Sequence, residues 1–261
     1  MPRTLQTMAG FFTAAGAGTN VATPAPGDNF SVASFSPSSK AYLENVSAAG
    51  ATTDFVRIRS PRLHDVNQGL RLFTGATKQR NLLPWGMNET LYSSDNPTVE
   101  IDATGAGSGG ILVTYGYDDL NGGNPRLDVW PSIQPRIVHV SGVEVDVTSG
   151  AIGAWGNGAA INSSFDNFEA GADYALLGYI CSAPCLGVAL TGKDTSNFKI
   201  GGPGDGDPIK TREYFINAAN ETGRPFIPII AANNKGGTIL QNVDVAAATA
   251  IKVTLLLAQL A

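Results

Sequence analysis

Apolar and polar residues alternate along several segments of this chain. Val143, Val145 and Val147 are separated by the acidic residues Glu144 and Asp146. Successive side chains of a β-strand point to opposite faces, so this spacing predicts a strand with one buried and one solvated face. Two further segments have the same spacing: Ile111, Val113, Tyr115 and Tyr117, and Ile239, Gln241, Val243 and Val245, in which Gln241 is the polar exception.

Short apolar runs and frequent turn residues complete the pattern. The runs 174–180 and 253–257 predict strands that are buried on both faces. Turn-forming residues separate the segments at 109–110, 121–125, 201–208 and 233–237, and the chain holds 31 glycines and 15 prolines. Many short strands with regular turns favour an all-β sandwich or barrel.

Helices are expected to be few and short. One is predicted over 210–219, with Tyr214 and Phe215 directed inward, and a second over 65–73.

The later part of the chain repeats an earlier part at a nearly constant distance. VRIRSPRL at 56–63 resembles FKIGGPGD at 198–205, which places Ile58 against Ile200 and Pro61 against Pro203. Further matches, at offsets between 140 and 144 residues, pair Leu72-Phe73 with Tyr214-Phe215, Pro84 with Pro228, Asp102 with Asp244, and GGILVTYGYDDL at 109–120 with TAIKVTLLLAQL at 249–260.

We therefore expect two copies of one β-domain, at 1–125 and 126–261, joined by the Gly/Asn/Pro-rich stretch from Asn121 to Pro131. Each half can hold eight strands of about 5–6 residues plus turns. Eight strands are what a jelly roll requires. The expected fold is thus all-β, with two tandem jelly-roll barrels related by internal duplication.

Charged residues make up only 15% of the chain, against about 25% in a typical soluble domain. The surface is then either buried against other subunits or solvated by Ser, Thr, Asn and Gly. The net charge of −5 excludes an overall nucleic-acid-binding footprint. One basic stretch stands out, with Asp65 as its only acid, and it is a candidate contact with genome, lipid headgroups or another subunit: Arg57, Arg59, Arg62, Arg71, Lys78 and Arg80.

Sequence signals place the chain in a reducing compartment. The start of the sequence has no secretion signal, and no apolar run reaches the about 20 residues of a membrane-spanning helix. Synthesis and assembly in a host cytoplasm are therefore expected. Cys181 and Cys185 are expected to be buried free thiols, because two thiolates cannot complete a zinc site and a reducing cytoplasm disfavours a disulfide.

Candidate catalytic chemistry is sparse. The two histidines, His64 and His139, lie in different halves, and His139 falls in a predicted strand. The run 187–194, GVALTGKD, has the spacing of a phosphate-binding loop, but Asp194 replaces the required Ser or Thr and no helix is predicted after it. We interpret the run as a strand ending in a turn, and we expect neither enzymatic activity nor a cofactor.

Acidic loops offer one candidate metal site. A structural calcium takes six to eight oxygen ligands, often from carboxylates and loop carbonyls. Candidate ligands are Asp118, Asp119, Asp205 and Asp207, although we favour the interpretation that they are solvated turn residues.

A duplicated β-barrel without an active-site motif resembles the double jelly-roll major capsid proteins of tailless icosahedral viruses, which include membrane-containing bacteriophages. The repeat of VRIRSP, LLP and GGILVTYGYDDL as FKIGGP, FIP and TAIKVTLLLAQL carries this resemblance. It implies two barrels side by side, and a homotrimer with a pseudo-hexagonal outline that tiles an icosahedral virion shell. The implied partners are other copies, other capsid proteins, and an internal membrane or the genome, with no small-molecule substrate.

Two other classes of function stay open. A carbohydrate- or receptor-binding β-sandwich, such as a viral spike, requires an exposed aromatic platform, and the three tryptophans are scattered at Trp85, Trp130 and Trp155. An enzyme on a β-scaffold is the third class, and activity lost on substituting a histidine would indicate it.

Overall fold

The protein is mostly β, as expected. The computed structural model describes residues 4–31, 40–50, 53–60, 69–73, 80–82, 90–92, 96–117, 124–161, 168–204 and 207–261. Over these residues the strands form four sheets, in which every neighbouring pair is antiparallel. Helices are short and confined to the second half of the chain within the same ranges.

The first two sheets use strands from the first half of the chain. Their strands are β1 (Thr4–Ala14), β2 (Gly18–Val21), β3 (Thr23–Pro24), β4 (Lys40–Ala49), β5 (Thr53–Arg59), β6 (Leu70–Phe73), β7 (Arg80–Leu82), β8 (Thr90–Tyr92), β9 (Thr98–Ala103) and β10 (Gly107–Tyr117). One sheet has the order β3-β1-β10-β4-β7, with β8 also paired to β4, and the other has the order β2-β9-β5-β6.

The second half forms the other two sheets. Its strands are β11 (Leu127–Asp128), β12 (Ile137–Thr148), β13 (Ala159–Ala160), β14 (Asp173–Cys181), β15 (Gly187–Thr191), β16 (Ile200–Pro203), β17 (Ile227–Ala231), β18 (Ile239–Val243) and β19 (Ala250–Leu260). The sheet orders are β11-β17-β14-β19-β12 and β13-β18-β15-β16. The helical segments are α1 (Trp130–Ile133), η1 (Gln134–Arg136), η3 (Lys193–Thr195), α2 (Pro208–Thr211), α3 (Tyr214–Thr222) and η4 (Ala232–Gly237).

Both halves pair their strands in the same nested way. In the second half β12 pairs with β19, β13 with β18, β14 with β17, and β15 with β16. In the first half β1 pairs with β10, β2 with β9, β4 with β7, and β5 with β6, while β3 and β8 are additions. The links between these pairs also correspond, since β10 pairs with β4 as β19 does with β14, and β9 with β5 as β18 does with β15.

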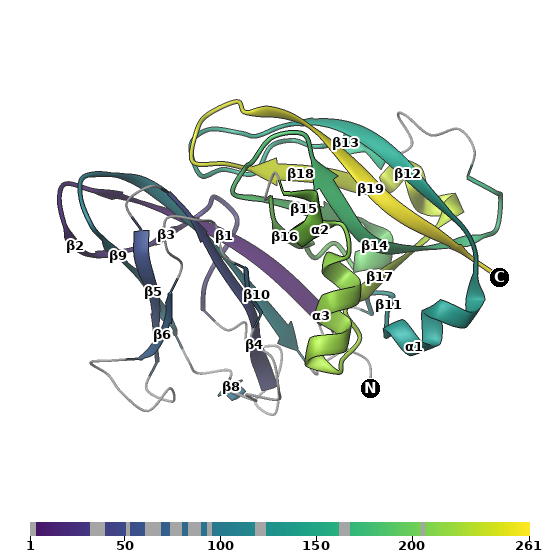
Figure 1. Cartoon of the computed structure of the whole chain (residues 1–261), viewed down its shortest axis with the longest axis horizontal. Coiled ribbons are helices and arrows are strands. Elements are labelled where there is room, and N and C mark those ends of the chain that lie inside the picture. Colours follow the sequence, from purple (N-terminus) through teal and green to yellow (C-terminus); the bar gives the residue numbers. More distant parts are fainter. Residues whose placement is uncertain are drawn as a thin grey trace.

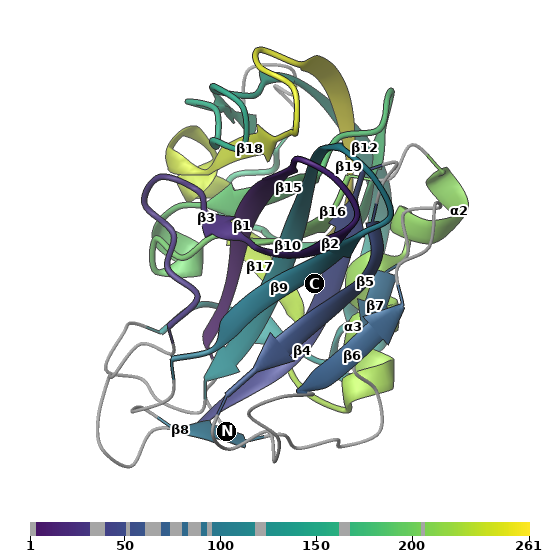
Figure 2. The ribbon, with the colours of Figure 1, turned by 90° about the vertical axis from the view of Figure 1, so that its left-hand side faces the viewer.

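The four sheets are stacked as layers from left to right in Figure 1. From the left of the view the order is β2-β9-β5-β6, β1-β10-β4, β16-β15-β18 and β14-β19-β12. Figure 2 looks onto the first of these layers. Contacts between β1 and β16, and between β10 and β16, join the halves at the centre.

Each half has its own apolar core, built by the predicted alternation. Val143, Val145 and Val147 of β12 are buried, whereas Glu144 and Asp146 between them are exposed. In the first half, Ile111, Val113, Tyr115 and Tyr117 of β10 are buried in a separate cluster. The solvated face expected for this strand is wrong, because Leu112 and Thr114 on its other face are buried as well, with Leu112 in a cluster shared by both halves. The division proposed at 125/126 falls in the connection between β10 and β11.

Two local predictions need correction. The helix expected over 65–73 is wrong over its last four residues, because Leu70–Phe73 form β6, with Leu70 and Leu72 packed against the core; residues 65–68 lie outside the described part. The linker expected up to Pro131 ends earlier, because β11 pairs with β17 and α1 begins at Trp130.

The helix expected over 210–219 exists in two pieces, α2 and α3. Tyr214 and Phe215 are buried as predicted, and their rings pack edge-on, 5.1 Å apart, against the core of the second half.

Candidate functional site

The most elaborate site in the described structure is the junction between the second and third layers. A cluster of small apolar side chains from both halves fills it, with Trp155 packed alongside: Ala9, Ala25, Ala49, Leu112, Leu186 and Val243. Two glycines allow the close approach. A Cβ added to Gly187 would lie 2.2 Å from a methyl group of Leu112, and one added to Gly110 would lie 2.5 Å from a methyl group of Leu186.

A buried carboxylate lies at the centre of the junction. Asp28, in the segment after β3, has a side chain that is 1% exposed. It accepts hydrogen bonds from the backbone N–H of Ala9 at 2.8 Å, from the indole N–H of Trp155 at 2.7 Å and from the ammonium group of Lys199 at 2.5 Å. Lys199 also lies over the Trp155 ring, 5.2 Å from its centroid. Two of the three donors come from the other half, so Asp28 ties the halves together.

Backbone and charge contacts extend the junction on both sides of Asp28. The N–H of Thr7 in β1 donates to the carbonyl of Lys199 at 2.7 Å, and the N–H of Gly201 in β16 donates to the Thr7 hydroxyl at 3.1 Å. Arg224 bonds Glu44 of β4 at 2.9 Å, and its guanidinium lies 3.9 Å from the ring centroid of Tyr42. These bonds fix the position of one half against the other.

The basic stretch predicted as a contact surface falls partly on the first layer. Arg57 and Arg59 of β5 both form ion pairs with Glu100 of β9, and the Arg57 Nε–Glu100 Oε2 distance is 2.7 Å. The Arg57 and Glu100 side chains are only 15% and 5% exposed, so this charge is largely internal to the sheet. Arg71 of β6 is exposed and stacks on the ring of Phe55 at 5.0 Å.

The side chains of the other three members of that stretch lie outside the described residues. Arg62 and Lys78 lie outside the described residues, and Arg80 belongs to β7 but its side chain lies outside them. The structure therefore brings Arg57, Arg59 and Arg71 to neighbouring strands.

The acidic candidates do not assemble into a metal site where they are described. Asp207 caps α2, because its carboxylate accepts the N–H of Ile209 at 3.0 Å. Asp118, Asp119 and Asp205 lie outside the described residues. Among the residues that are placed, no group of three or more His, Cys, Asp and Glu side chains is arranged to hold a metal ion.

The phosphate-loop-like run is a strand ending in a turn, as interpreted. Residues 187–191 form β15, and the three-residue η3 follows in place of a helix. The carboxylate of Asp194 is buried and accepts the N–H of Ala231 at 3.0 Å and the amide N–H of Asn234. Arg126 lies 3.8 Å from it and holds Asp173 in a bidentate pair, which raises the pKa of Arg126. Asp194 thus links the loops around η3, β17 and η4.

The other candidate reactive side chains that the structure describes are one histidine and two cysteines. His139 is exposed and lies on β12, as predicted for a strand residue, at the edge of its sheet. Cys181 and Cys185 are buried thiols, as expected. His64 lies outside the described residues.

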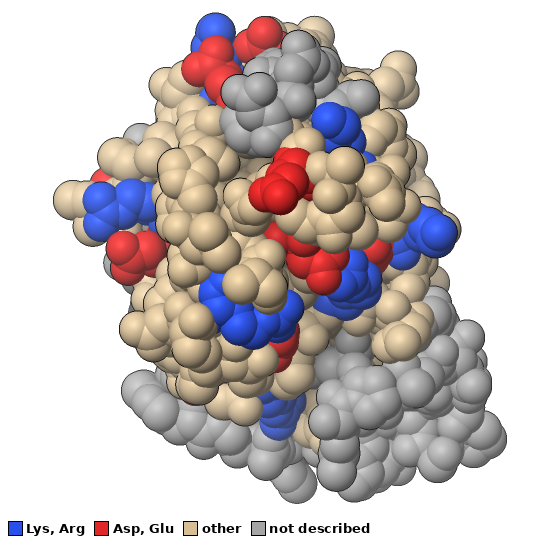
Figure 3. Space-filling view, turned by 90° about the vertical axis from the view of Figure 1, so that its right-hand side faces the viewer, with Lys and Arg blue, Asp and Glu red and all other residues tan. Residues whose placement is uncertain are grey.

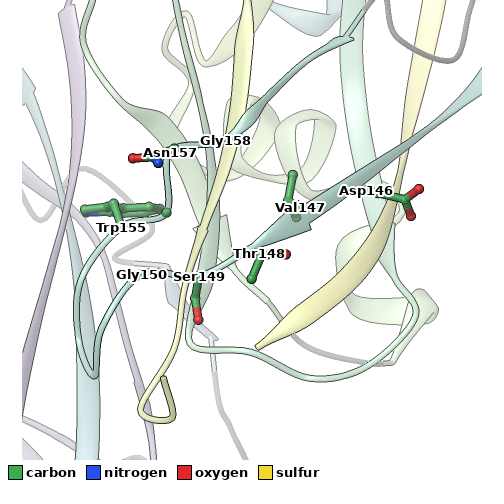
Figure 4. Close-up of a pocket in the computed structure, with 9 residues that line it drawn as sticks. Asp146, Val147, Thr148, Ser149, Gly150, Trp155, Asn157 and Gly158 are labelled. Carbon is green, nitrogen blue, oxygen red and sulfur yellow. The ribbon is translucent and has the colours of Figure 1, made fainter. Parts of the chain in front are cut away.

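A pocket of about 340 Å³ opens beside the end of β12 and the segment 155–158 (Figure 4). Trp155 and Asp146 lie at its opposite ends. Two of its polar groups have structural partners: the Trp155 N–H bonds Asp28, and the Ser149 hydroxyl accepts the N–H of Thr249 at 2.9 Å.

The junction residues carry no signal that sequence reasoning could use. Asp28 is separated from Trp155 by 127 positions and from Lys199 by 171. The alanines and glycines of the cluster resemble any others in a chain rich in both.

The chain matches no known protein-family model and no curated protein sequence. Of the helices that the structure describes, none has the length and hydropathy needed to cross a bilayer.

Proposed function

We propose that this chain is a double jelly-roll major capsid protein, which forms homotrimers of pseudo-hexagonal outline that tile an icosahedral virion shell. The nested strand pairing of both halves carries the proposal. A jelly roll is a long antiparallel hairpin of eight strands folded over so that strand one pairs with eight, two with seven, three with six and four with five. Each half has these four pairings.

Internal duplication is supported by the end of the sequence repeat. The match of 109–120 with 249–260 places β10 on β19, the last strand of each half, and Asp102 of β9 corresponds to Asp244, directly after β18. The match of Ile58 with Ile200 does not fit, because it aligns β5 with β16, whereas β15 is the strand of the second half that occupies the position of β5 in the strand order. The duplication therefore rests on strand order and on the last two strands of each half.

A structural role also agrees with the chemistry of the site. The buried polar groups of the junction hold two sheets together and present no reactive group to solvent. A glycan-binding module would present exposed aromatic rings, and the large apolar side chains that are exposed among the described residues are all aliphatic: Val21, Val138, Val140, Ile152 and Ile209. The protein is then a building block located in the virion and assembled in the host cytoplasm.

Light scattering after size exclusion tests the proposal. A homotrimer has a mass of three times 27.1 kDa, 81.3 kDa. That mass, or particles built from it, supports the proposal, and electron microscopy should then show a hexagonal outline. A stable 27.1 kDa monomer at high concentration contradicts it, and binding to immobilised glycans by that monomer would favour the sandwich-module class instead.

A further inference from the structure

The segment that joins β12 to β13 places an asparagine directly before a glycine. Asn157 is followed by Gly158, and both line the pocket beside the end of β12 (Figure 4). In such a pair the backbone nitrogen of the glycine can reach the side-chain carbonyl carbon of the asparagine, and glycine has no Cβ to shield that nitrogen. An intramolecular attack of this kind is fast where the two groups are free to meet.

The segment is held on both sides of this pair but not at the pair itself. The N–H of Gly156 donates to the carbonyl of Asn242 at 2.9 Å, and Ala159 pairs with Leu240 of β18. The segment thus advances three residues, from 156 to 159, while β18 advances two, from 242 to 240, as in a β-bulge. Gly158 has a φ of +76°, in the left-handed region that glycine adopts readily.

The two groups that must meet are unrestrained at this bulge. The Asn157 side chain is exposed, and within the described structure neither its amide group nor the N–H of Gly158 takes part in a hydrogen bond. Asn234 provides the contrast, because its amide nitrogen donates to both carboxylate oxygens of Asp194, at 2.9 and 3.0 Å. The Asn157 amide can therefore turn toward the next backbone nitrogen, whereas the Asn234 amide is held in place.

We propose that Asn157 is a site of spontaneous deamidation, with water as the co-reactant. The Gly158 nitrogen loses its proton to hydroxide and bonds to Cγ of Asn157, and the Cγ–Nδ2 bond breaks to release ammonia. Water then opens the resulting cyclic imide. Opening at Cγ gives aspartate, and opening at the backbone carbonyl carbon gives isoaspartate, in which the main chain runs through Cβ and Cγ and is longer by a carbon. The reaction requires only this chain and water, so its test is independent of the proposed function.

Isoaspartate at this position disturbs the junction between the halves. Trp155 lies just before the pair, and its indole N–H donates to the buried Asp28 at 2.7 Å. The side-chain amide of Gln241 donates to the carbonyl of Gly156 at 2.7 Å, which adds a second bond between the segment and β18. A longer main chain between Gly156 and Ala159 shifts one of these anchors against the other, because both are fixed on the same strand. Isoaspartate therefore loosens the hold of Trp155 on Asp28, whereas aspartate leaves the main chain unchanged.

Incubation of the intact protein at mildly alkaline pH, in native buffer and in urea, followed by peptide mapping with mass spectrometry, tests the proposal. In native buffer Asn157 should convert at a rate close to its rate in the unfolded chain, and roughly tenfold faster than Asn234, which Lys235 follows. Conversion changes the net charge from −5 to −6. Figure 3, which views the β12-β19 end, shows charged side chains in small groups on a largely uncharged surface, so anion exchange should separate the converted protein.

Two variants separate the steps. Asn157→Gln keeps an amide on a longer side chain that closes a ring far more slowly, so it should show no shift on anion exchange. Asn157→Asp carries the charge of the aspartate product on an unchanged main chain, and should unfold at the same urea concentration as the fresh wild type. The isoaspartate fraction of the aged wild type, identified by enzymatic methylation, should unfold at a lower urea concentration than Asn157→Asp.

Other outcomes overturn the inference in distinguishable ways. If Asn157 keeps its amide in native buffer but loses it in urea, the fold protects the pair and the site is not reactive. If Asn157→Gln acquires the same anion-exchange shift as the wild type, the modified residue is another one. If isoaspartate forms but unfolds together with Asn157→Asp, the effect assigned to it at the junction is wrong.

Discussion

Removing the Asp28 carboxylate should destabilise the junction more than any other single charge removal there. Asp28→Ala leaves Lys199 without its counter-ion and leaves the N–H groups of Ala9 and Trp155 without an acceptor. Breaking a buried ion pair by removing one partner costs about 3–5 kcal/mol. Lys199 is 21% exposed and regains some hydration, so we expect a loss of about 3 kcal/mol in the free energy of unfolding, at the lower end of that range.

Urea denaturation, followed by circular dichroism at one fixed protein concentration, measures this loss. Asp28→Asn preserves the volume but not the charge, and should cost about 2 kcal/mol, since a hydrogen bond to a charged group is worth about 1.5–3 kcal/mol. A double-mutant cycle of Asp28→Asn with Lys199→Met isolates the coupling between the two side chains. Glu213→Ala is the control, because Glu213 forms an exposed ion pair with Arg212 that contributes about 0–1 kcal/mol. A loss below about 1 kcal/mol for Asp28→Ala would refute the role assigned to this carboxylate.

Three further predictions concern the cores and the helix ends. Burial, and to a lesser degree the neighbouring Tyr117, raise the pKa of Tyr115 above its ordinary value of 10.0. The unfolded chain therefore loses this proton first, so the free energy of unfolding should be constant below pH 10 and should fall above it by about 1.4 kcal/mol per pH unit for this group. Tyr115→Phe should remove that slope in urea titrations between pH 8 and 11. Gly178→Ala should cost about 1–3 kcal/mol, because its Cβ would lie 2.1 Å from the backbone oxygen of Arg212, whereas Gly16→Ala, with nothing within 4 Å, should be nearly neutral in thermal melts. Asp207→Ala should lower the free energy of unfolding by about 1 kcal/mol through loss of the α2 cap, and Asp207→Asn should restore most of it.

The sequence allowed prediction of those strands and buried faces that follow from the local alternation of apolar and polar residues. Alternation placed the buried face of β12, because a strand with one solvated face must alternate, but it missed that β10 is buried on both faces. The helix expected over 65–73 was wrong at 70–73, because that prediction overlooked that Leu70 and Leu72, two positions apart, have the spacing of a strand. The match of Ile58 with Ile200 also failed. A short strand that ends near a proline is too common a pattern to identify one strand among the eight of each half.

The junction was beyond prediction because it depends on contacts between distant segments. The geometry that makes Asp28 important exists only after two sheets from different halves have packed together. The exposed valines are out of phase with the buried ones, because Val138 and Val140 occupy even positions and Val143 and Val145 odd positions, so Val140 lies on the opposite face of β12 from Val143. The alternation within β12 could therefore have placed Val140 on the exposed face from the sequence alone.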